Sequence, residues 1–260
     1  MRKYGYLVVE GPHDVEFVYR LLRPLGLRRK RKVDEVDASI ARLIPKEYPP
    51  DGDLQKRMST PLFLQSNTHA IAIQNATGDS QLTLKLEEAV AMLGLSGIVL
   101  SSLGILLDSD TKTLAASRYF DIRQDMKKMG FALPEKPGDV ALGPPRIGAF
   151  VLPDNASAGT LEDLLLDSAN VVYPNLLDSA ISHIDTALTN PDLLPVDLED
   201  FNKPAGRKKA IIGAMASILK PGKAVQVSIQ DNRWLKDKKA LELPRIKSVQ
   251  AFLKTLFELP

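Results

Sequence analysis

Residues 6–14 read Tyr-Leu-Val-Val-Glu-Gly-Pro-His-Asp, an apolar run that ends in acidic residues. Residues 104–110 read Gly-Ile-Leu-Leu-Asp-Ser-Asp and repeat this arrangement far along the chain. Short apolar runs of this kind are typical of buried strands, and in open α/β sheets ligands bind beyond the carboxyl ends of parallel strands. We therefore expect four carboxylates to meet at one edge of a parallel sheet. They belong to Glu10, Asp14, Asp108 and Asp110.

Carboxylates gathered at one edge repel one another, since two like charges in contact cost about 4 kcal/mol at an effective dielectric constant near 20. Such a cluster needs a bound cation or protons. Oxygen ligands alone favour a hard divalent ion, so Mg²⁺ or Mn²⁺ is the expected cofactor. The chain contains no cysteine, which excludes a thiolate metal site and a disulfide framework.

Each carboxylate also fits a purely structural role. Asp14 precedes a stretch with apolar residues at helical spacing, so it fits a helix N-cap as well as a metal ligand. Asp108 and Asp110 flank a serine, and an Asp-Ser-Asp sequence favours a turn held by side-chain to backbone hydrogen bonds. Glu10 fits a strand end at the surface, although solvation alone explains poorly a charge directly after an apolar strand. The occurrence of two such clusters after strands favours the functional interpretation.

These motifs resemble those of the topoisomerase–primase (Toprim) fold family. There a Glu-Gly pair follows the first strand, an Asp often lies a few residues on, and an Asp-x-Asp pair follows a later strand. A third segment, residues 150–163, is similar to the end of a small branch of Toprim-like proteins. That branch is itself similar to the Toprim part of overcoming-lysogenization-defect (OLD) nucleases. The resemblance extends over about two thirds of the chain, to about Leu166.

The resemblance implies a metal-dependent phosphoryl-transfer enzyme, most directly a nuclease that hydrolyses DNA or RNA. Glu10 inherits the role of general acid or base, or of metal ligand, while Asp108 and Asp110 hold the metal and Asp14 assists. Secondary site residues implied in the same way also fit turns or helix caps. They are Asp154, Glu162 and Asp163. The chain lacks a Gly-x-x-x-x-Gly-Lys ATPase loop, so an ATP-driven activity would need a separate ATPase partner.

Two other classes of function stay open. A binding or regulatory module could keep the acidic site for a metal, a nucleotide or nucleic acid without turnover. A phosphatase of the haloacid-dehalogenase type also carries Asp-x-Asp after a strand. In that family the motif follows the first strand, whereas here it lies mid-chain, with Lys112 as its fifth residue.

Basic residues predict a nucleic-acid partner less directly. The formal net charge is only +2, but Arg28, Arg29, Lys30, Arg31 and Lys32 are consecutive. Such a block can neutralise backbone phosphates without sequence preference. An ordinary solvated loop has the same composition, so the block fits both interpretations.

The order of patterns predicts an α/β fold, a Toprim-like (Rossmann-like) parallel sheet of four strands flanked by helices. We expect residues 1–166 to form this α/β domain, with 28–66 as a long connection or lid. Residues 167–260 are expected to form a mainly helical extension packed on it, in which 225–229 alternates like a short edge strand. The four expected strands cover residues 6–9, 69–73, 103–107 and 146–152.

Composition bounds the remaining expectations. At 260 residues and 44% hydrophobic content, the chain can bury one large core or a core with a small appendage. No apolar run is long enough to span a bilayer, so we expect no membrane partner. The absence of cysteine fits the reducing cytoplasm, which is the expected location. A homo-oligomer is a further expected form of association.

Overall fold

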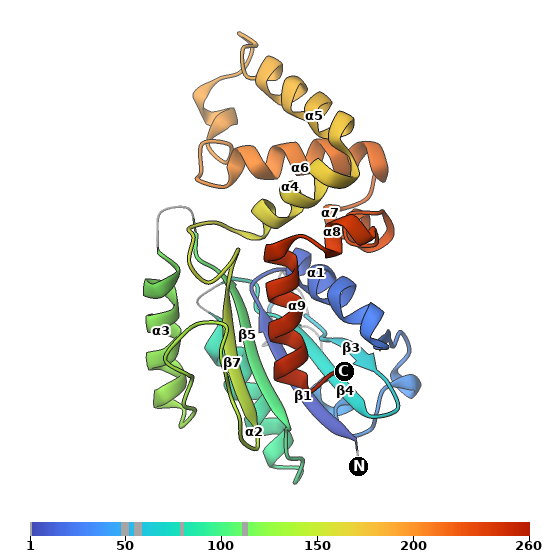
Figure 1. Ribbon diagram of the computed structural model, residues 1–260, viewed down its shortest axis with the longest axis vertical. Coiled ribbons are helices and arrows are strands. Elements are labelled where there is room, and N and C mark those ends of the chain that lie inside the picture. Colours follow the sequence, from blue (N-terminus) through green and yellow to red (C-terminus); the bar gives the residue numbers. More distant parts are fainter. Residues whose placement is uncertain (1, 48–51, 55–58, 79–80, 111–113) are drawn as a thin grey trace. The chain divides into compact units, whose positions relative to one another are not determined.

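The computed structural model describes residues 2–47, 52–54, 59–78, 81–110 and 114–260. Within these ranges the strands form a seven-stranded sheet in the order β2-β3-β4-β1-β5-β7-β6 (Figure 1). The bounds are Lys3–Val9 (β1), Arg28–Arg29 (β2), Leu62–Gln65 (β3), His69–Asn75 (β4), Ser102–Asp108 (β5), Val140–Ala141 (β6) and Arg146–Leu152 (β7). The α/β class is confirmed. The expected number of four strands is wrong, because short strands extend the sheet on both sides.

The four strands expected from the sequence form the centre of the sheet. β1 pairs in parallel with β4 on one side and with β5 on the other, where Val9 lies opposite Leu106. β7 follows β5 in the sheet, and Arg146 N at its start donates to Ser101 O just before β5. Parallel strands buried on both faces consist of nearly continuous apolar residues. That property made these four strands visible in the sequence.

The outer strands are short and antiparallel. β3 pairs with β4, β2 with β3, and β6 with β7, in each case antiparallel. The segment 28–66, expected as a connection or lid, therefore contributes two strands, together with the 3-10 helices η2 (Val33–Glu35) and η3 (Ala41–Leu43). Residues 48–51 and 55–58 of that segment lie outside the described residues, and the expectation that 28–66 acts as a lid stays a prediction.

Helices flank the sheet and make up most of the chain after β7 in the described ranges. They are α1 (Pro12–Leu22), α2 (Leu82–Gly94), α3 (Ala115–Lys128), α4 (Leu161–Val172), α5 (Pro174–Ala187), α6 (Gly206–Leu219), α7 (Val225–Asp231), α8 (Lys238–Leu241) and α9 (Pro244–Phe257). Two further 3-10 helices are η1 (Arg23–Leu25) and η6 (Pro195–Leu198). Among the residues described, no helix combines the length and the apolar character needed to cross a membrane.

The C-terminal helix covers three neighbouring strands that each carry a glycine (Figure 1). A Cβ atom added at Gly5 of β1 would lie 2.7 Å from the Phe257 ring, and one at Gly104 of β5 would lie 2.5 Å from Leu256. At Gly148 of β7 the corresponding distance to the Phe252 ring is 2.8 Å. The three glycines therefore let α9 approach the sheet more closely than any larger residue would permit.

The chain divides into two compact units. The first contains residues 1–107, 119–150 and 250–260, and the second contains residues 108–118 and 151–249. The expected domain end at residue 166 lies within α4, in the second unit.

One predicted element of the second unit is wrong. Residues 225–229 were expected as a short strand but form most of α7, which buries Ser228 and Ile229. The buried Ser228 accepts a hydrogen bond from Trp234 Nε1 at 2.9 Å, and Trp234 itself is fully buried. This contact favours the helix, and Trp234 is a packing residue.

Candidate active site

Glu10 stands directly after β1 and is partly buried. The segment after β4 runs beside it, since Ala76 N donates to Val9 O at 2.8 Å and Gly78 N donates to Glu10 O at 3.2 Å. The first unit therefore places this residue at the carboxyl edge of the parallel strands.

Asp14 closes the start of α1 from inside the helix. The helix begins at Pro12 after the N-cap Gly11, so Asp14 is the third helical residue and the expected N-cap position is corrected by three residues. Its Oδ2 accepts a hydrogen bond from Gly11 N at 2.8 Å, which satisfies a backbone donor that the helix leaves unpaired. The Asp14 side chain is only 7% exposed, so this bond fixes a buried carboxylate in one orientation.

Asp108 makes the corresponding contact in the second unit, although it comes from a distant part of the chain. It is the last residue of β5, and its Oδ1 accepts a hydrogen bond from Leu161 N, the first residue of α4, at 2.9 Å. The positive end of the helix dipole stabilises a carboxylate in this position. The Asp108 carbonyl oxygen also accepts from Arg118 Nε at 3.3 Å. The first bond joins the end of β5 to a helix 53 residues away, and the second joins it to α3, the next helix of the chain.

Ser109 connects the loop after β5 to the loop before α4, and sequence reasoning passed over it. The residue is fully buried, and its Oγ accepts from Gly159 N at 2.7 Å. The same hydroxyl lies 3.0 Å from Gly159 O and 3.1 Å from Ser157 O, either of which it can donate to. Asp110 follows with a φ of 64° in the left-handed region and an exposed side chain. Ser109 therefore holds the two loops together. The turn expected after Asp108 continues into residues 111–113, which lie outside the described residues, and stays a prediction.

Two of the secondary carboxylates have structural partners. Asp154 accepts from Ser157 N at 2.7 Å and pairs with Arg245 at 3.0 Å. Burial raises the pKa of Asp154, but the hydrogen bonds from Ser157 and Ala156 and the charge of Arg245 lower it by more. Asp163, the third residue of α4, accepts from Thr160 N at 2.9 Å.

Lys208 pairs with Asp163 at 2.6 Å. Lys208 and Arg245 were not singled out as partners of acidic residues, because both pairs join residues far apart in the sequence.

Glu162 differs from these two carboxylates. It lies in the first turn of α4 next to Leu161, and only 6% of its surface is exposed. No hydrogen bond or ion pair of its carboxylate occurs among the described residues. Its carboxylate oxygens still reach solvent, since neither is among the fully buried atoms that lack a partner, so a cation can bind there. Asp108 binds the backbone of Leu161, and Glu162 is the next residue of α4.

The carboxylates do not form a complete metal centre by themselves. In the described part of the chain, no three His, Asp or Glu side chains are arranged so that they could hold a metal ion together. Oxygen donors of the kind that Mg²⁺ and Mn²⁺ prefer are present at the starts of both α1 and α4.

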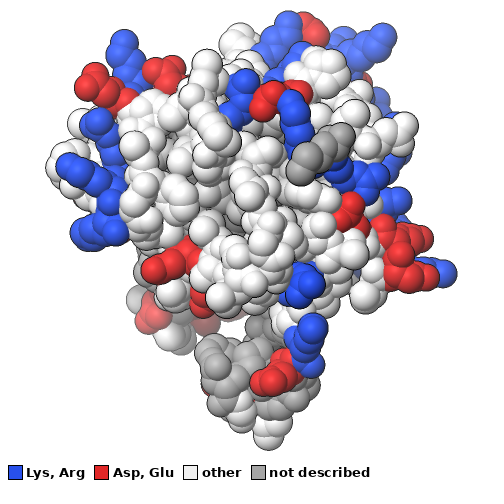
Figure 2. Space-filling view, turned by 90° about the horizontal axis from the view of Figure 1, so that it is seen from below, with Lys and Arg blue, Asp and Glu red and all other residues white. Residues whose placement is uncertain are grey.

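The five consecutive basic residues do not form one surface. Arg29 pairs with Glu16 at 2.6 Å and its guanidinium lies 4.6 Å from the centre of the Tyr19 ring. Arg28 is adjacent in β2 and therefore points to the opposite face. On the face shown in Figure 2, Lys and Arg are spread along the rim with Asp and Glu among them. A nucleic-acid contact through the whole block stays a prediction, and Arg29 is the member with a clear structural role.

Comparison with known proteins shows the family and the fold. The chain belongs to a family described as proteins of unknown function (DUF3226), whose model matches residues 4–258. The crystal structure of a hypothetical protein from Pyrococcus horikoshii OT3 is similar, with a TM-score of 0.52 and 16% sequence identity. The match covers 98% of this chain and 95% of that one. No curated protein matches the sequence.

Proposed function

For this member of the DUF3226 family, we propose a metal-dependent phosphoryl transfer on nucleic acid, most directly as a Mg²⁺- or Mn²⁺-dependent nuclease. The observation that carries the proposal is the register of β1 and β5. Val9 lies opposite Leu106 in two adjacent parallel strands, Glu10 follows Val9, and β5 ends at Asp108. Acidic residues thus follow neighbouring strands at the edge where α/β sheets bind ligands. The resemblance to the Toprim family supports the same chemistry.

The residues that would hold the metal are Glu10, Asp108 and Asp110, with Asp14 assisting and Glu162 as a further ligand. A bound divalent ion would supply an activated oxygen nucleophile and stabilise the leaving oxygen. Backbone N–H groups orient two of these carboxylates, since Gly11 N binds Asp14 and Leu161 N binds Asp108. Such outer hydrogen bonds to metal-ligating carboxylates are typical of metal sites.

The role of Glu10 is to move a proton or to position the reactive ion. Its place directly after a buried strand holds its backbone firmly, through the hydrogen bond that Gly78 donates to its carbonyl oxygen. Location in the cytoplasm and an associated ATPase chain are parts of the same proposal. The absence of cysteine is compatible with the cytoplasm. An ATPase partner is required only if the activity is driven by ATP, because the chain has no ATPase loop of its own.

A binding module that has lost turnover is the second candidate. It is favoured by the fact that, in the described ranges, no three metal-binding side chains converge. It is also favoured by the capping contacts of Asp14 and Asp108, which account for their hydrogen bonds without a metal. A dehalogenase-type phosphatase is the third candidate. The fifth position of its motif, Lys112, lies outside the described residues.

The test compares the wild type with Glu10→Gln, which keeps the shape of the side chain and removes its charge. End-labelled single- and double-stranded DNA and RNA are incubated with each protein in Mg²⁺, in Mn²⁺ and in EDTA. We expect cleavage by the wild type only with metal, and a loss of about 10²–10⁴-fold in the variant, the usual worth of a general acid or base.

The matched control is Asp121→Asn, an isosteric change at an exposed carboxylate of α3. It should cleave like the wild type. Equal cleavage by Glu10→Gln and the control would remove Glu10 from the mechanism. No cleavage by the wild type of any substrate would favour the binding module.

A further inference from the structure

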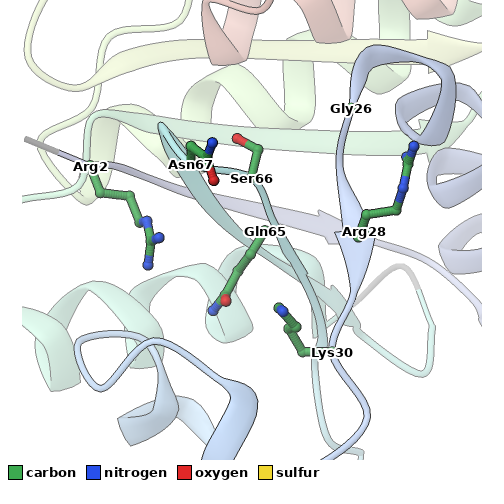
Figure 3. A pocket seen from close by; sticks show the side chains of 7 residues that line it. All are labelled: Arg2, Gly26, Arg28, Lys30, Gln65, Ser66 and Asn67. Carbon is green, nitrogen blue, oxygen red and sulfur yellow. The ribbon is translucent and has the colours of Figure 1, made fainter.

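The first unit contains a basic pocket of about 370 Å³ at the other end of β1 (Figure 3). It is lined by Arg2, Gly26, Arg28, Lys30, Gln65, Ser66 and Asn67. These residues come from the start of β1, from β2 and the turn before it, and from the turn that joins β3 to β4. The lining includes three cationic side chains and no carboxylate.

The acidic residues near the pocket are already engaged. Asp37 pairs with Arg2 at 2.6 Å and accepts from Ser39 N at 3.0 Å. Burial raises the pKa of Asp37, but these hydrogen bonds lower it by more, so it stays ionised and holds Arg2 in place. Glu35 is exposed and accepts from Arg31 N at 3.1 Å. Hydrogen bonds from the backbone of Arg31 and Lys32 lower the pKa of Glu35.

Lys30 supplies further positive charge to the lining; it interacts with Glu35 through space, since the Lys30 charge also lowers the pKa of Glu35. Within the described ranges, its ammonium group makes no hydrogen bond and no ion pair. Arg28 adds a second positive charge, because its guanidinium donates to two neutral carbonyl oxygens, those of Arg23 at 2.7 Å and Leu27 at 3.1 Å. Figure 3 shows Arg2 and Lys30 on either side of Gln65, whereas Arg28 turns toward Gly26.

Neutral hydrogen-bond donors complete the lining. The Asn67 side chain is exposed and makes no hydrogen bond among the described residues, so its amide group is available to a ligand. Ser66 Oγ accepts from His69 N at 3.1 Å and from Thr68 N at 3.3 Å. Those bonds fix the turn between β3 and β4. The Ser66 hydroxyl also lies 3.4 Å from Thr68 Oγ1, and when Thr68 is the donor of that pair the Ser66 proton can be donated to a ligand.

We propose that this pocket binds a phosphate group through Arg2, Lys30, Ser66 and Asn67. Charge-assisted bonds from cations, together with neutral donors in a concave site, are the usual means of phosphate recognition. The phosphate belongs either to a free nucleotide or to the backbone of a nucleic acid. The inference is independent of the proposed nuclease activity, because the pocket and Glu10 lie at opposite ends of β1. Seven residues of strand separate them, about 23 Å at roughly 3.3 Å per residue.

The first experiment titrates the full-length protein with sodium phosphate at constant ionic strength and follows the amide and side-chain resonances by NMR. We expect Lys30→Gln to weaken phosphate binding about tenfold, the ratio that corresponds to about 1.4 kcal/mol. Asn67→Ala removes an exposed side chain without a partner and should weaken it about threefold. Lys32→Gln is the matched control, since it removes the same charge from the same exposed block but does not line the pocket.

The outcomes decide the proposal. Binding that falls with Lys30→Gln and Asn67→Ala but not with Lys32→Gln supports it. Equal weakening by Lys30→Gln and Lys32→Gln would show diffuse charge only and overturn it, as would the absence of phosphate binding to the wild type.

The same variants are then titrated with adenosine monophosphate and with a labelled single-stranded oligonucleotide. Loss confined to the mononucleotide identifies a nucleotide site, and parallel loss for the oligonucleotide identifies a backbone contact. Neither result depends on cleavage activity.

Discussion

The helices α1 and α4 begin in the same way but are surrounded differently. In each, an Asp at the third helical position binds the backbone N–H of the residue before the helix, Asp14 at 2.8 Å and Asp163 at 2.9 Å. At α4 a further carboxylate arrives from another strand, since Asp108 binds the first N–H of the helix. The α4 start also carries a cation, because Lys208 pairs with Asp163.

The comparison separates acidic residues that cap their own helix from an acidic residue that reaches a helix start from a distant part of the chain. An Asp at the third helical position follows from helix capping alone, so it is poor evidence for a metal site. Asp108 is 53 residues from its partner Leu161, and no local preference accounts for such a contact. Among the acidic residues at the two helix starts, Asp108 therefore has the strongest claim to a functional role.

The largest expected effect tests that claim directly. Under the proposed function, Asp108→Asn should lower turnover roughly 10²–10³-fold, a loss typical of removing a group that stabilises the transition state electrostatically. Asp163→Asn, with its local role, should stay within a few fold of the wild type. Steady-state cleavage assays on folded proteins make the measurement. Equal losses of turnover in the two variants would mean that Asp108 has no special role.

Metal-linked stability is the next effect in size. A metal present at 100 times its dissociation constant should raise the free energy of unfolding by about 2.7 kcal/mol by mass action. The double variant Asp108→Asn and Asp110→Asn should lose this gain, while Asp163→Asn should keep it. Urea unfolding with Mg²⁺ or Mn²⁺ and with EDTA measures the gain. An unchanged gain in the double variant would place the ion elsewhere.

The two helix caps should differ in strength. Asp163→Ala removes a cap and strands the charge of Lys208, and it should cost about 2 kcal/mol, within the range for hydrogen bonds to charged groups. Asp14→Ala removes the cap on Gly11 N and should cost about 1 kcal/mol, the usual cost of losing a helix cap. Unfolding midpoints in urea compare them. A larger cost at Asp14 would indicate that its carboxylate has a stronger partner than Gly11 N.

The smallest expected effect on stability concerns the loop that precedes α4. Only α4 follows a long loop, which Asp154 holds through Ser157 and Arg245. Because folding lowers the pKa of Asp154, its contribution is full above the unfolded value near 3.9. It is lost as the pH falls through the folded value.

The free energy of unfolding of the wild type should therefore exceed that of the Asp154→Asn variant by about 1 kcal/mol at pH 6. This difference should close only below about pH 4. Denaturant titrations of both proteins at several pH values provide the measurement. A gap that is independent of pH down to 3 would contradict the role of the ionised carboxylate.

The sequence predicted the centre of the sheet better than its edges. The runs around Val8 and Ile105 are apolar because central parallel strands are buried on both faces. β2 and β6 have two residues each, too few for any periodicity to appear. Their pairing depends on the neighbouring strand rather than on their own sequence. The count of strands could therefore not be predicted, although the class could.

The error at α7 has a different cause. Val225, Val227 and Ile229 alternate with polar residues, which is the pattern of a half-buried strand. The same residues are compatible with a helix that buries Ser228 and Ile229, and the bond from Trp234 favours that arrangement. Tertiary contacts override such a short pattern.

The candidate site was predictable in part. The sequence identified the acidic residues because they follow apolar runs, and the two runs form β1 and β5, which are adjacent parallel strands. It could not identify which acids bind backbone groups of distant helices. Nor could it predict the role of Ser109, since a buried serine between two aspartates differs from an exposed one only through its fold.

The packing of α9 on the three strand glycines has a consequence for folding during synthesis. Gly5 meets Phe257, so a strand at the beginning of the chain is completed by a helix about 250 residues later. Loops of that length close slowly, because entropy must be lost before the contact forms. While the ribosome works, the nascent chain carries the apolar face of β1, β5 and β7 uncovered until α9 emerges. During synthesis that face is a natural binding site for chaperones and the place where incomplete chains would aggregate.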